Sequence, residues 1–339
     1  EGTKIMVYYP VDGVSPMQKL QMVTQEGVNV EVVAIHGNFD DAQSAVKRIF
    51  TDEETRAKLD RDGMMLSSAN WINWGRLAPQ IAYYVSAYCD MVKSGAVKMG
   101  EKINICVPTG NFGNILAAYI AKRMGLPVNK FICASNRNNV LTDFFKNSGT
   151  YDKNRDFYTT TSPSMDILIS SNLERLLFFA SDFNDKLVAE LMQRLTTEGS
   201  YQAPEAVFAK IAADFDAGCC DDKQTAETIR ALWENEHYLS DTHTAVAVRV
   251  YEDYRARTGD QTPTVIASTA SPFKFCRSVI EALGGTLEKD DVSQLAVLTD
   301  LTGVPAPAPL AALADKQPRF DRVVDKSEIL STVDLLKDL

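Results

Sequence analysis

Short apolar runs alternate with helix-compatible segments along the N-terminal part of the chain. The runs at 4–9 and 30–35 have the length of strands, and the segment 16–24 between them is compatible with a helix. A second helix is expected from Asp40, which can cap the amphipathic positions Ala42, Ala45, Val46 and Ile49. This order of strand, helix, strand and helix predicts a parallel sheet.

A change of pattern near residue 66 separates two domains. A charged stretch at 51–62 is followed by the loop-forming residues 67–70. Beyond them the pattern predicts a helix at 76–92, a strand at 103–107, a helix at 114–124 and a strand at 130–134. Residues 1–66 are therefore expected to form the remainder of a smaller α/β domain, and residues 67–303 a larger α/β domain with a helical insertion.

The rest of the chain is mostly helical by its pattern. Helices dominate 184–233, and a helix at 244–254, a short strand at 264–267 and a helix at 277–282 follow. The segment 304–339 begins with the alternating prolines Pro305, Pro307 and Pro309, which remove backbone donors from any helix or central strand. This C-terminal tail is expected to pack on the surface.

The expected fold class is α/β, with two open, mostly parallel sheets and helices on both faces. The apolar run at 4–9 starts almost at the first residue. Because the two strands within residues 1–66 cannot bury both faces of a parallel sheet, we expect further strands upstream, in a chain that is incomplete at its N-terminus.

Composition and charge narrow the class of protein. Hydrophobic residues make up 45% and charged residues 24%, as in ordinary globular proteins. A net charge of −10 repels nucleic-acid phosphates, so no nucleic-acid partner is expected. No apolar run approaches the roughly 18 residues of a membrane helix, and no basic start or apolar signal core is present. We therefore expect a cytoplasmic protein with no membrane association.

Cysteine and histidine usage argues against a metal centre. None of the six cysteines belongs to a CxxC pair, and the three histidines show neither HxxxH nor HxH spacing. His243 follows Asp241 and Thr242 and is interpreted as a helix-start residue capped by one of these two side chains. No metal is expected, and free thiols fit a reducing compartment.

The main candidate site is the junction between the strand at 103–107 and the helix at 114–124. Gly110, Asn111, Phe112 and Gly113 lie where first-turn amides and the helix dipole bind anions. Glycine there lets the backbone approach phosphate oxygens. The spacing matches neither GxGxxG nor the nucleotide P-loop, which favours a small phosphorylated ligand. The alternative is that the glycines only form a tight turn.

Several short motifs stand in one order along nearly the whole chain. They are Tyr9-Pro10, Val14-Ser15-Pro16, Asn38-Phe39-Asp40-Asp41, Ser68-Ala69-Asn70, Asn73-Trp74-Gly75-Arg76-Leu77, Gly110-Asn111-Phe112-Gly113, Ser164-Met165-Asp166-Ile167 and Ser268-Thr269-Ala270-Ser271-Pro272. In this order they resemble the threonine synthases, which are pyridoxal 5′-phosphate enzymes of fold type II in the tryptophan synthase beta-like superfamily. The resemblance implies that residues 110–113 and Asn114 hold the cofactor phosphate.

The resemblance also assigns a partner to the pyridine nitrogen of the cofactor. In this family the partner is a hydroxyl, and Thr269 stands at the matching position, just after the strand at 264–267. A neutral hydroxyl leaves the ring less electron-poor than a carboxylate would. Without the resemblance, Thr269 is an ordinary loop residue.

The substrate that the resemblance implies, O-phospho-L-homoserine, carries a second phosphate that needs a cation and neutral donors. Asn70 and Arg76 match the family's substrate-phosphate positions, and Asn73 is a secondary candidate. Without the resemblance, Arg76 is a solvated helical arginine. Trp71 replaces the serine that is usual in the family, so either the substrate differs, the activity is impaired, or the indole turns away.

The lysine that holds the cofactor in this family belongs to a Ser-Phe-Lys-Asp motif, expected upstream of residue 1. The sequences around Lys146 and Lys274 resemble it only superficially, because both lie in segments that match other parts of the family. No catalytic residue is therefore assigned in this chain. It is expected to hold the phosphate cradle and much of the substrate site without performing the reaction alone.

As a whole, the resemblance implies a threonine synthase that converts O-phospho-L-homoserine and water into L-threonine and phosphate, as a monomer or homodimer. Two alternatives remain open. One is a related phospho-lyase that releases 2-oxobutanoate, and the other is a non-catalytic protein that keeps the anion site.

Overall fold

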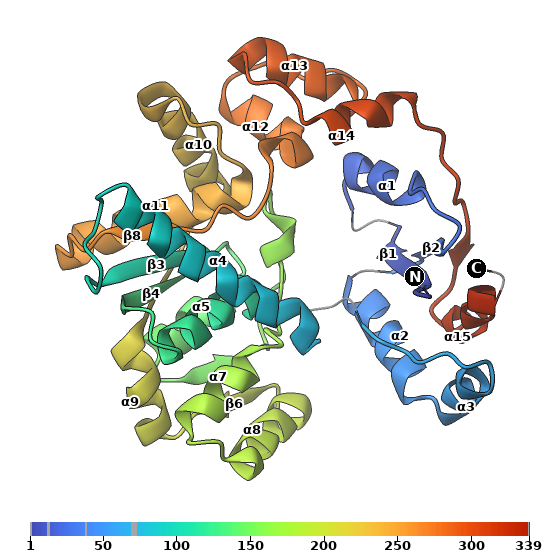
Figure 1. Ribbon diagram of the computed structural model, residues 1–339, viewed down its shortest axis with the longest axis horizontal. Coiled ribbons are helices and arrows are strands. Elements are labelled where there is room, and N and C mark those ends of the chain that lie inside the picture. The colour runs from blue at the N-terminus through green and yellow to red at the C-terminus, as the bar shows by residue number, and fades with distance from the viewer. Residues whose placement is uncertain (1, 12–13, 38, 69–72, 338) are drawn as a thin grey trace. The chain divides into compact units, whose positions relative to one another are not determined.

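The computed structural model describes residues 2–11, 14–37, 39–68, 73–337 and 339 (Figure 1). The chain forms two compact units: unit 1 comprises Glu1–Ser67 and Leu287–Leu339, and unit 2 comprises Ser68–Thr286. The first division lies next to the one expected near residue 66. The second lies before the expected residue 303, because the segment from Leu287 onward makes its contacts within unit 1.

Unit 1 is built on a parallel sheet of three strands in the order β1-β2-β9. These strands are β1 (Ile5–Pro10), β2 (Val30–Ile35) and β9 (Val323–Val324). A partner strand for β2 thus comes from the C-terminal segment, which corrects the expectation of a tail that only packs on the surface. Two hydrogen bonds fix it, from Ala34 N to Arg322 O at 2.9 Å and from His36 N to Val324 O at 3.1 Å. Two consecutive valines are too short a run for periodicity to reveal.

The helices of unit 1 come from both ends of the chain. They are α1 (Pro16–Val23), α2 (Phe39–Thr51), α3 (Glu53–Arg61), α13 (Ser293–Thr302), α14 (Ala308–Ala311) and α15 (Ile329–Thr332). The charged stretch at 51–62 contains α3, which Asp52 caps by accepting the Thr55 amide at 2.8 Å. Ile35 of β2 is buried in one cluster with Ile49 of α2 and Ile329 of α15. The two ends of the chain therefore share one core.

Unit 2 contains a parallel sheet of four strands in the order β7-β4-β3-β8. These strands are β3 (Ile103–Pro108), β4 (Val128–Ser135), β7 (Phe215–Cys219) and β8 (Thr264–Ile266). All six residues of β3 are buried, as expected for a central strand. β7 lies in the stretch 184–233, where helices were expected to dominate and no strand was predicted. Its mixed residues carry little strand signal, and pairing with β4 decides its conformation.

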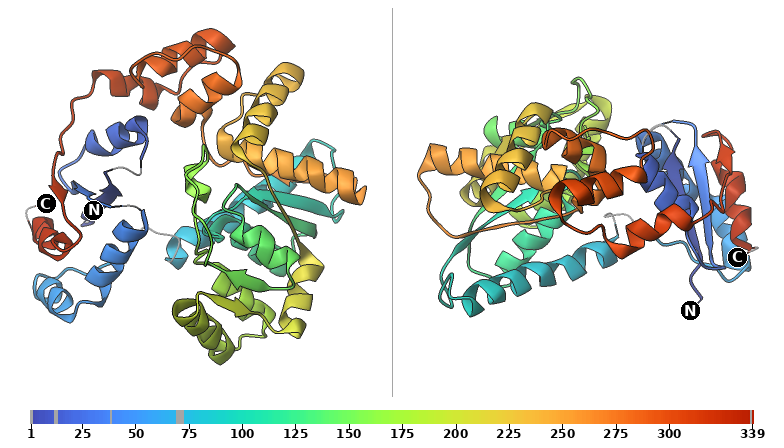
Figure 2. Two further views of the ribbon diagram at one scale, coloured as in Figure 1. Left: turned by 180° about the vertical axis from the view of Figure 1, so that it is seen from behind. Right: turned by 90° about the horizontal axis from the view of Figure 1, so that it is seen from above.

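Helices cover both faces of this sheet (Figures 1 and 2). They are α4 (Trp74–Lys93), α5 (Gly113–Arg123), α6 (Val140–Lys146), α7 (Leu173–Ala180), α8 (Asp185–Thr197), α9 (Glu205–Asp214), α10 (Asp222–Glu236), α11 (Thr242–Thr258) and α12 (Cys276–Ala282). A separate antiparallel pair consists of β5 (Thr150–Asp152) and β6 (Ser200–Gln202). Ile105 packs in one cluster with Leu116 of α5, whereas the next residue, Cys106, packs in another with Val246 of α11. The expected α/β class, with parallel sheets and helices on both faces, is confirmed.

The strand order creates a topological switch point beside β3. The chain passes from β3 outward through β4 to β7 and later returns to β8 on the other side of β3. In open parallel sheets, ligands bind outside the carboxyl ends of the strands where the order reverses in this way. Since β3 and β8 pair directly, the loops that follow them leave the same edge of the sheet side by side.

Candidate functional site

The loop after β3 is shaped by Phe112, the N-cap of α5. Its backbone is left-handed, with φ 60° and ψ 8°, a conformation that costs a residue with a side chain about 1–2 kcal/mol. The ring is 1% exposed, and its centroid lies 6.2 Å from that of Phe145 and 5.9 Å from that of Phe215. Burial of such a side chain stabilises by about 1.5–3 kcal/mol, which offsets the backbone strain.

The backbone amides of this loop are available to a ligand. Within the described ranges, none of the N–H groups of residues 110–114 donates a hydrogen bond, and no side chain caps α5. The loop carbonyls are occupied instead. Gly110 O accepts from Ser170 Oγ at 2.8 Å, and Asn111 O accepts from Asn172 Nδ2 at 2.8 Å. Free amides at the start of an 11-residue helix form a site for an anion.

Gly110 stands where the loop has no room for a side chain. A Cβ built there would lie 2.5 Å from the carbonyl oxygen of Ser164, which belongs to the short 3₁₀ helix Pro163–Met165. The neighbouring atom is backbone and cannot turn aside as a flexible side chain would. The glycine therefore does more than permit a turn, because it lets two loops pack backbone to backbone.

Asn114, in the first turn of α5, is oriented by Tyr84 of α4, which sequence reasoning missed. The Tyr84 hydroxyl donates to Asn114 Oδ1. Burial raises the pKa of Tyr84 far above its ordinary value, so the phenol remains a donor. With its oxygen occupied, the Asn114 amide offers its two N–H donors to another partner. Only the place of Tyr84 on the buried face of α4 could have pointed to it.

Thr269 lies in the loop after β8, at the same edge of the sheet as the Gly110 loop. The residue is exposed, and its neighbour Ser268 anchors the loop. Ser268 Oγ accepts from Tyr238 OH at 3.3 Å and lies 3.2 Å from Thr244 Oγ1. Pairing of β3 with β8 thus brings together two segments more than 150 residues apart.

The substrate-phosphate candidates are only partly described. Asn70 and Trp71 lie outside the described residues. Asn73 is the N-cap of α4, where its Oδ1 accepts from Gly75 N at 2.9 Å and its Nδ2 donates to Ser68 O at 2.7 Å. Arg76 is an exposed residue in the first turn of the same helix, so both described candidates stand at one helix N-terminus.

The start of α11 agrees with the interpretation of His243 as a helix-start residue. Asp241 is the N-cap, and its Oδ1 accepts from His243 N at 2.8 Å and from Thr244 N at 3.3 Å. Capping by Asp241 is therefore confirmed. The sequence carried no signal for the second role of this carboxylate, a contact with the imidazole ring of His243 at 3.2 Å.

The other described ionisable groups bear on metal binding and on thiol chemistry. Among the residues the structure describes, no cluster of three or more His, Cys, Asp or Glu side chains could hold a metal ion. Burial raises the pKa of Cys133 and of Cys220 to about 12, so both thiols stay protonated.

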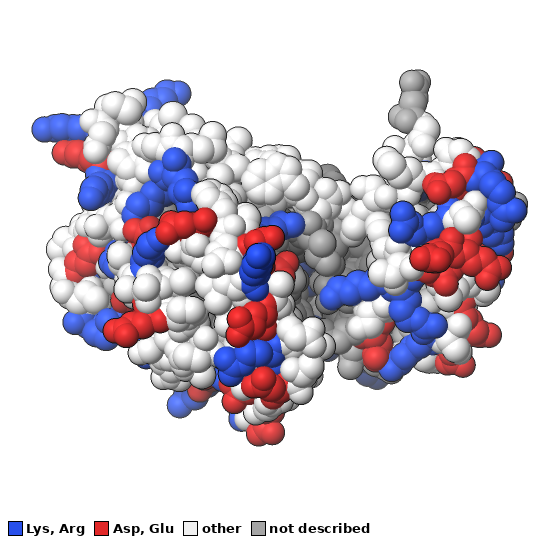
Figure 3. Space-filling model, turned by 90° about the horizontal axis from the view of Figure 1, so that it is seen from below, with Lys and Arg blue, Asp and Glu red and all other residues white. Residues whose placement is uncertain are grey.

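In the described part of the chain, no helix is both long and apolar enough to cross a bilayer. On the face drawn in Figure 3, acidic and basic side chains are interspersed over each unit.

Comparison with known families matches most of the chain to two of them. Residues 1–269 match the family described as pyridoxal-phosphate dependent enzyme, and residues 244–333 match the family described as threonine synthase, C-terminal. The first match includes both the Gly110 loop and Thr269.

Individual relatives point the same way. The human protein threonine synthase-like 1 is 42% identical over 305 residues, which are 89% of this chain and 40% of that protein. Threonine synthase of Saccharomyces cerevisiae is 36% identical over 308 residues, which are 86% of this chain and 58% of the yeast enzyme. A crystal structure of pyridoxal-phosphate-bound threonine synthase from Brucella melitensis superposes with a TM-score of 0.82 at 36% identity, covering 99% of this chain and 65% of that one. The chain thus spans between two fifths and two thirds of these proteins.

Proposed function

The chain belongs to the pyridoxal-phosphate-dependent enzyme family and is threonine synthase-like, and on that premise we propose that it forms the phosphate-binding part of a threonine synthase. The complete enzyme would convert O-phospho-L-homoserine and water into L-threonine and phosphate. The observation that carries this proposal is the row of free amides at residues 110–114, packed through Gly110 against Ser164.

The residues of the loop fit the phosphate of pyridoxal 5′-phosphate. Gly110, Asn111, Phe112 and Gly113 supply backbone amides at the positive end of the α5 dipole, and Asn114 adds side-chain donors. A second contact would come from the Thr269 hydroxyl, at the pyridine nitrogen. When bound, the cofactor withdraws electrons from the substrate through its ring. A neutral hydroxyl at the nitrogen keeps that withdrawal weaker than a carboxylate would.

The N-terminus of α4 fits the second phosphate, that of the substrate. Arg76 is an exposed residue in the first turn of this helix. Guanidinium groups bind phosphate in a bidentate manner, and the start of a helix favours an anion. Asn70 would donate to the same group, whereas Asn73 would act indirectly by fixing the start of the helix.

The roles that we propose for the residues of this chain are binding roles, because none of its lysines matches the family's Ser-Phe-Lys-Asp motif. Arg76 would bind the substrate phosphate while it departs from the γ-carbon as the leaving group, and the Gly110 loop would hold the cofactor in place. The base that moves protons at the substrate carbons would be the lysine expected upstream. The 339-residue chain alone should therefore bind phosphate ligands without turnover.

The test is a binding titration combined with an assay. Equilibrium dialysis of the 339-residue chain should show saturable binding of pyridoxal 5′-phosphate and, more weakly, of inorganic phosphate. Phosphate release from O-phospho-L-homoserine should be absent for this chain and present for a chain extended upstream by a segment that carries the expected lysine. Identifying the carbon product as threonine or 2-oxobutanoate separates a synthase from a phospho-lyase. A chain that binds neither ligand refutes a phosphate site at residues 110–114.

A further inference from the structure

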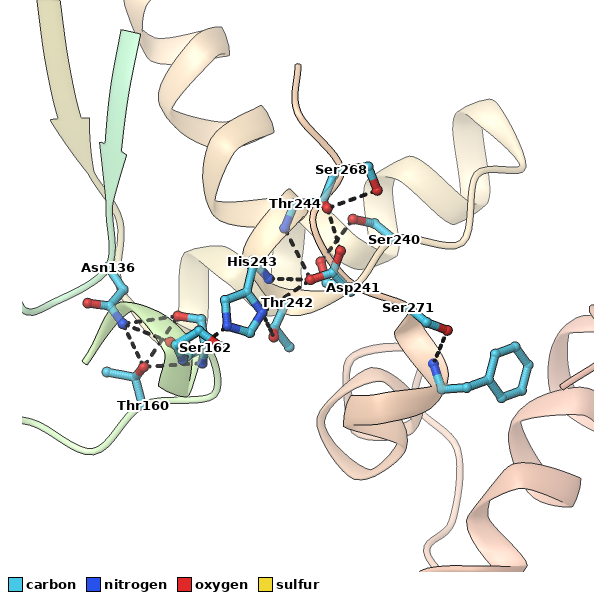
Figure 4. A network of polar contacts seen from close by, with 12 residues as sticks. Asn136, Thr160, Ser162, Ser240, Asp241, Thr242, His243, Thr244, Ser268 and Ser271 are labelled. Atoms are coloured by element: carbon cyan, nitrogen blue, oxygen red, sulfur yellow. Dashed lines mark hydrogen bonds and ion pairs between the residues drawn. The ribbon is translucent and has the colours of Figure 1, made fainter. Parts of the chain in front are cut away.

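A buried aspartate–histidine pair stands at the start of α11, outside the residues so far assigned to the ligand (Figure 4). His243 is 3% exposed and Asp241 1%. The imidazole Nδ1 lies 3.2 Å from Asp241 Oδ1, and Nε2 accepts from the backbone amide of Ser164 at 3.2 Å. An acceptor faces Nδ1 and a donor faces Nε2, an arrangement that suits a ring with its N–H at Nδ1 and its lone pair at Nε2.

On one side, this pair contacts the turn at Ser164, which packs against the Gly110 loop, the segment 110–114 proposed to bind phosphate. Ser164 donates its amide to His243, while its carbonyl oxygen occupies the space beside Gly110 where a Cβ would stand. The turn that contains Ser164 is also held by Asn136, the residue after β4, whose Nδ2 lies 3.1 Å from Ser162 Oγ. The hydrogen bond to the imidazole ring is therefore a second contact on a turn that is already held.

On the other side, the pair reaches the loop of Thr269. Thr244 Oγ1 donates to Asp241 Oδ2 and lies 3.2 Å from Ser268 Oγ, one residue before Thr269. An unbroken path of contacts thus runs from Gly110 through Ser164, His243, Asp241 and Thr244 to Ser268, as the dashed lines of Figure 4 trace for its central part. It joins the loops that follow β3 and β8.

We propose that Asp241 and His243 are a positioning pair that sets the separation between the Gly110 loop and the Thr269 loop. The inference rests on the proposed function, in which one loop holds the phosphate and the other the ring nitrogen of a single cofactor. One small ligand gains the affinity of both contacts only when the two loops are correctly spaced, so the support of the loops determines binding. Capping of α11 needs only the carboxylate of Asp241 and leaves the ring contacts of His243 unexplained.

The experiment compares a ligand that uses both loops with one that uses the phosphate loop alone. Dissociation constants for pyridoxal 5′-phosphate and for inorganic phosphate are measured on the 339-residue chain and its variants. His243→Phe keeps a ring but removes both hydrogen bonds, and should weaken pyridoxal phosphate about tenfold while phosphate changes less than about twofold. His243→Gln, whose amide oxygen can accept from Ser164, should restore part of the affinity.

Two further variants separate positioning from folding. Ser268→Ala changes an exposed side chain, leaves the imidazole in place, and should again weaken only pyridoxal phosphate. Leu195→Ala, in α8, removes a buried side chain of the same unit and should lower the melting temperature without changing the ratio of the two affinities.

Equal weakening of both ligands by His243→Phe, or no change in either in a folded variant, would overturn the positioning role. The positioning role is also overturned if the wild-type chain binds pyridoxal phosphate no more tightly than inorganic phosphate. The two loops would then not act on one ligand. Failure of the wild-type chain to bind either ligand would instead refute the cofactor site itself, and the positioning pair with it.

Discussion

The carbonyl oxygen of Ser164 fills the space into which a side chain on Gly110 would project, 2.5 Å from the position of its Cβ. Gly110→Ala should therefore displace the phosphate loop or the turn at Ser164, because backbone cannot move aside cheaply. We expect a loss of about 1–3 kcal/mol in unfolding free energy and at least about tenfold weaker binding of inorganic phosphate. Urea unfolding and equilibrium dialysis measure the two effects.

The matched control for this variant is Gly63→Ala in unit 1. Gly63 has a φ of +68° with open space around its Cβ position, so alanine adds backbone strain without a clash. The control should lose stability and keep wild-type phosphate affinity. Wild-type affinity in Gly110→Ala would show that the loop does not bind the anion.

Tyr84→Phe removes the hydroxyl that holds Asn114 Oδ1. The amide of Asn114 would then be free to rotate, and we expect about three- to tenfold weaker binding of phosphate. Because burial keeps the pKa of Tyr84 far above its ordinary value, the wild-type contact should persist up to pH 10, and titration calorimetry across pH 7–10 should show no loss from it.

Tyr88→Phe is the control on the same helix. The Tyr88 hydroxyl accepts from Gly100 N at 2.8 Å, away from the phosphate loop. This variant should change stability but not phosphate affinity. An equal loss of affinity in both variants would mean that α4 acts only through its packing.

Phe112 combines a strained backbone with a buried ring. Two substitutions separate the contribution of the strain to the unfolding free energy from that of the ring. Phe112→Ala keeps the left-handed strain and loses the ring, so it should destabilise by about 3–5 kcal/mol. Phe112→Gly loses the same ring but relieves the strain, and should be about 1 kcal/mol more stable than the alanine variant. The order of the two variants in urea unfolding is the measurement, and the reverse order would contradict the strain argument.

Asp260 supplies a pH-dependent stabilisation of unit 2. Burial alone would raise its pKa, but hydrogen bonds from Thr262, Tyr254 and Asn104 together hold the pKa well below its ordinary value. Tyr254 OH donates to Oδ2 at 2.7 Å and Asn104 Nδ2 at 2.9 Å. A lowered pKa means that the stabilisation is complete above an unfolded-state pKa of about 3.9 and is lost as the pH falls toward the folded-state value.

Asp260→Asn should therefore cost about 1–3 kcal/mol at pH 7, because an amide cannot accept all these bonds. The difference in unfolding free energy between wild type and variant should shrink when the pH is lowered from 7 to 3. A difference that stays constant over this range would show that the charge of Asp260 is not what stabilises the unit.

The sequence by itself was sufficient for the central α/β pattern and for the position of the loop between β3 and α5. The strand β3 and the helix α5 were predicted to within about one residue, since a fully buried strand and an amphipathic helix leave their periodicity in neighbouring residues. The loop between them followed from that junction. Capping of α11 by Asp241 is equally local, because the cap lies next to the residues whose amides it accepts.

The tertiary structure alone decided what depends on distant partners. Val323 and Val324 become a strand only because β2 offers an open edge, and β7 only because it pairs with β4. The contact of Tyr84 with Asn114 and that of His243 with Ser164 likewise join helices to loops far along the chain. Periodicity records which face of an element is buried. It does not record which element buries it, and at this site that choice determines how the loops are held.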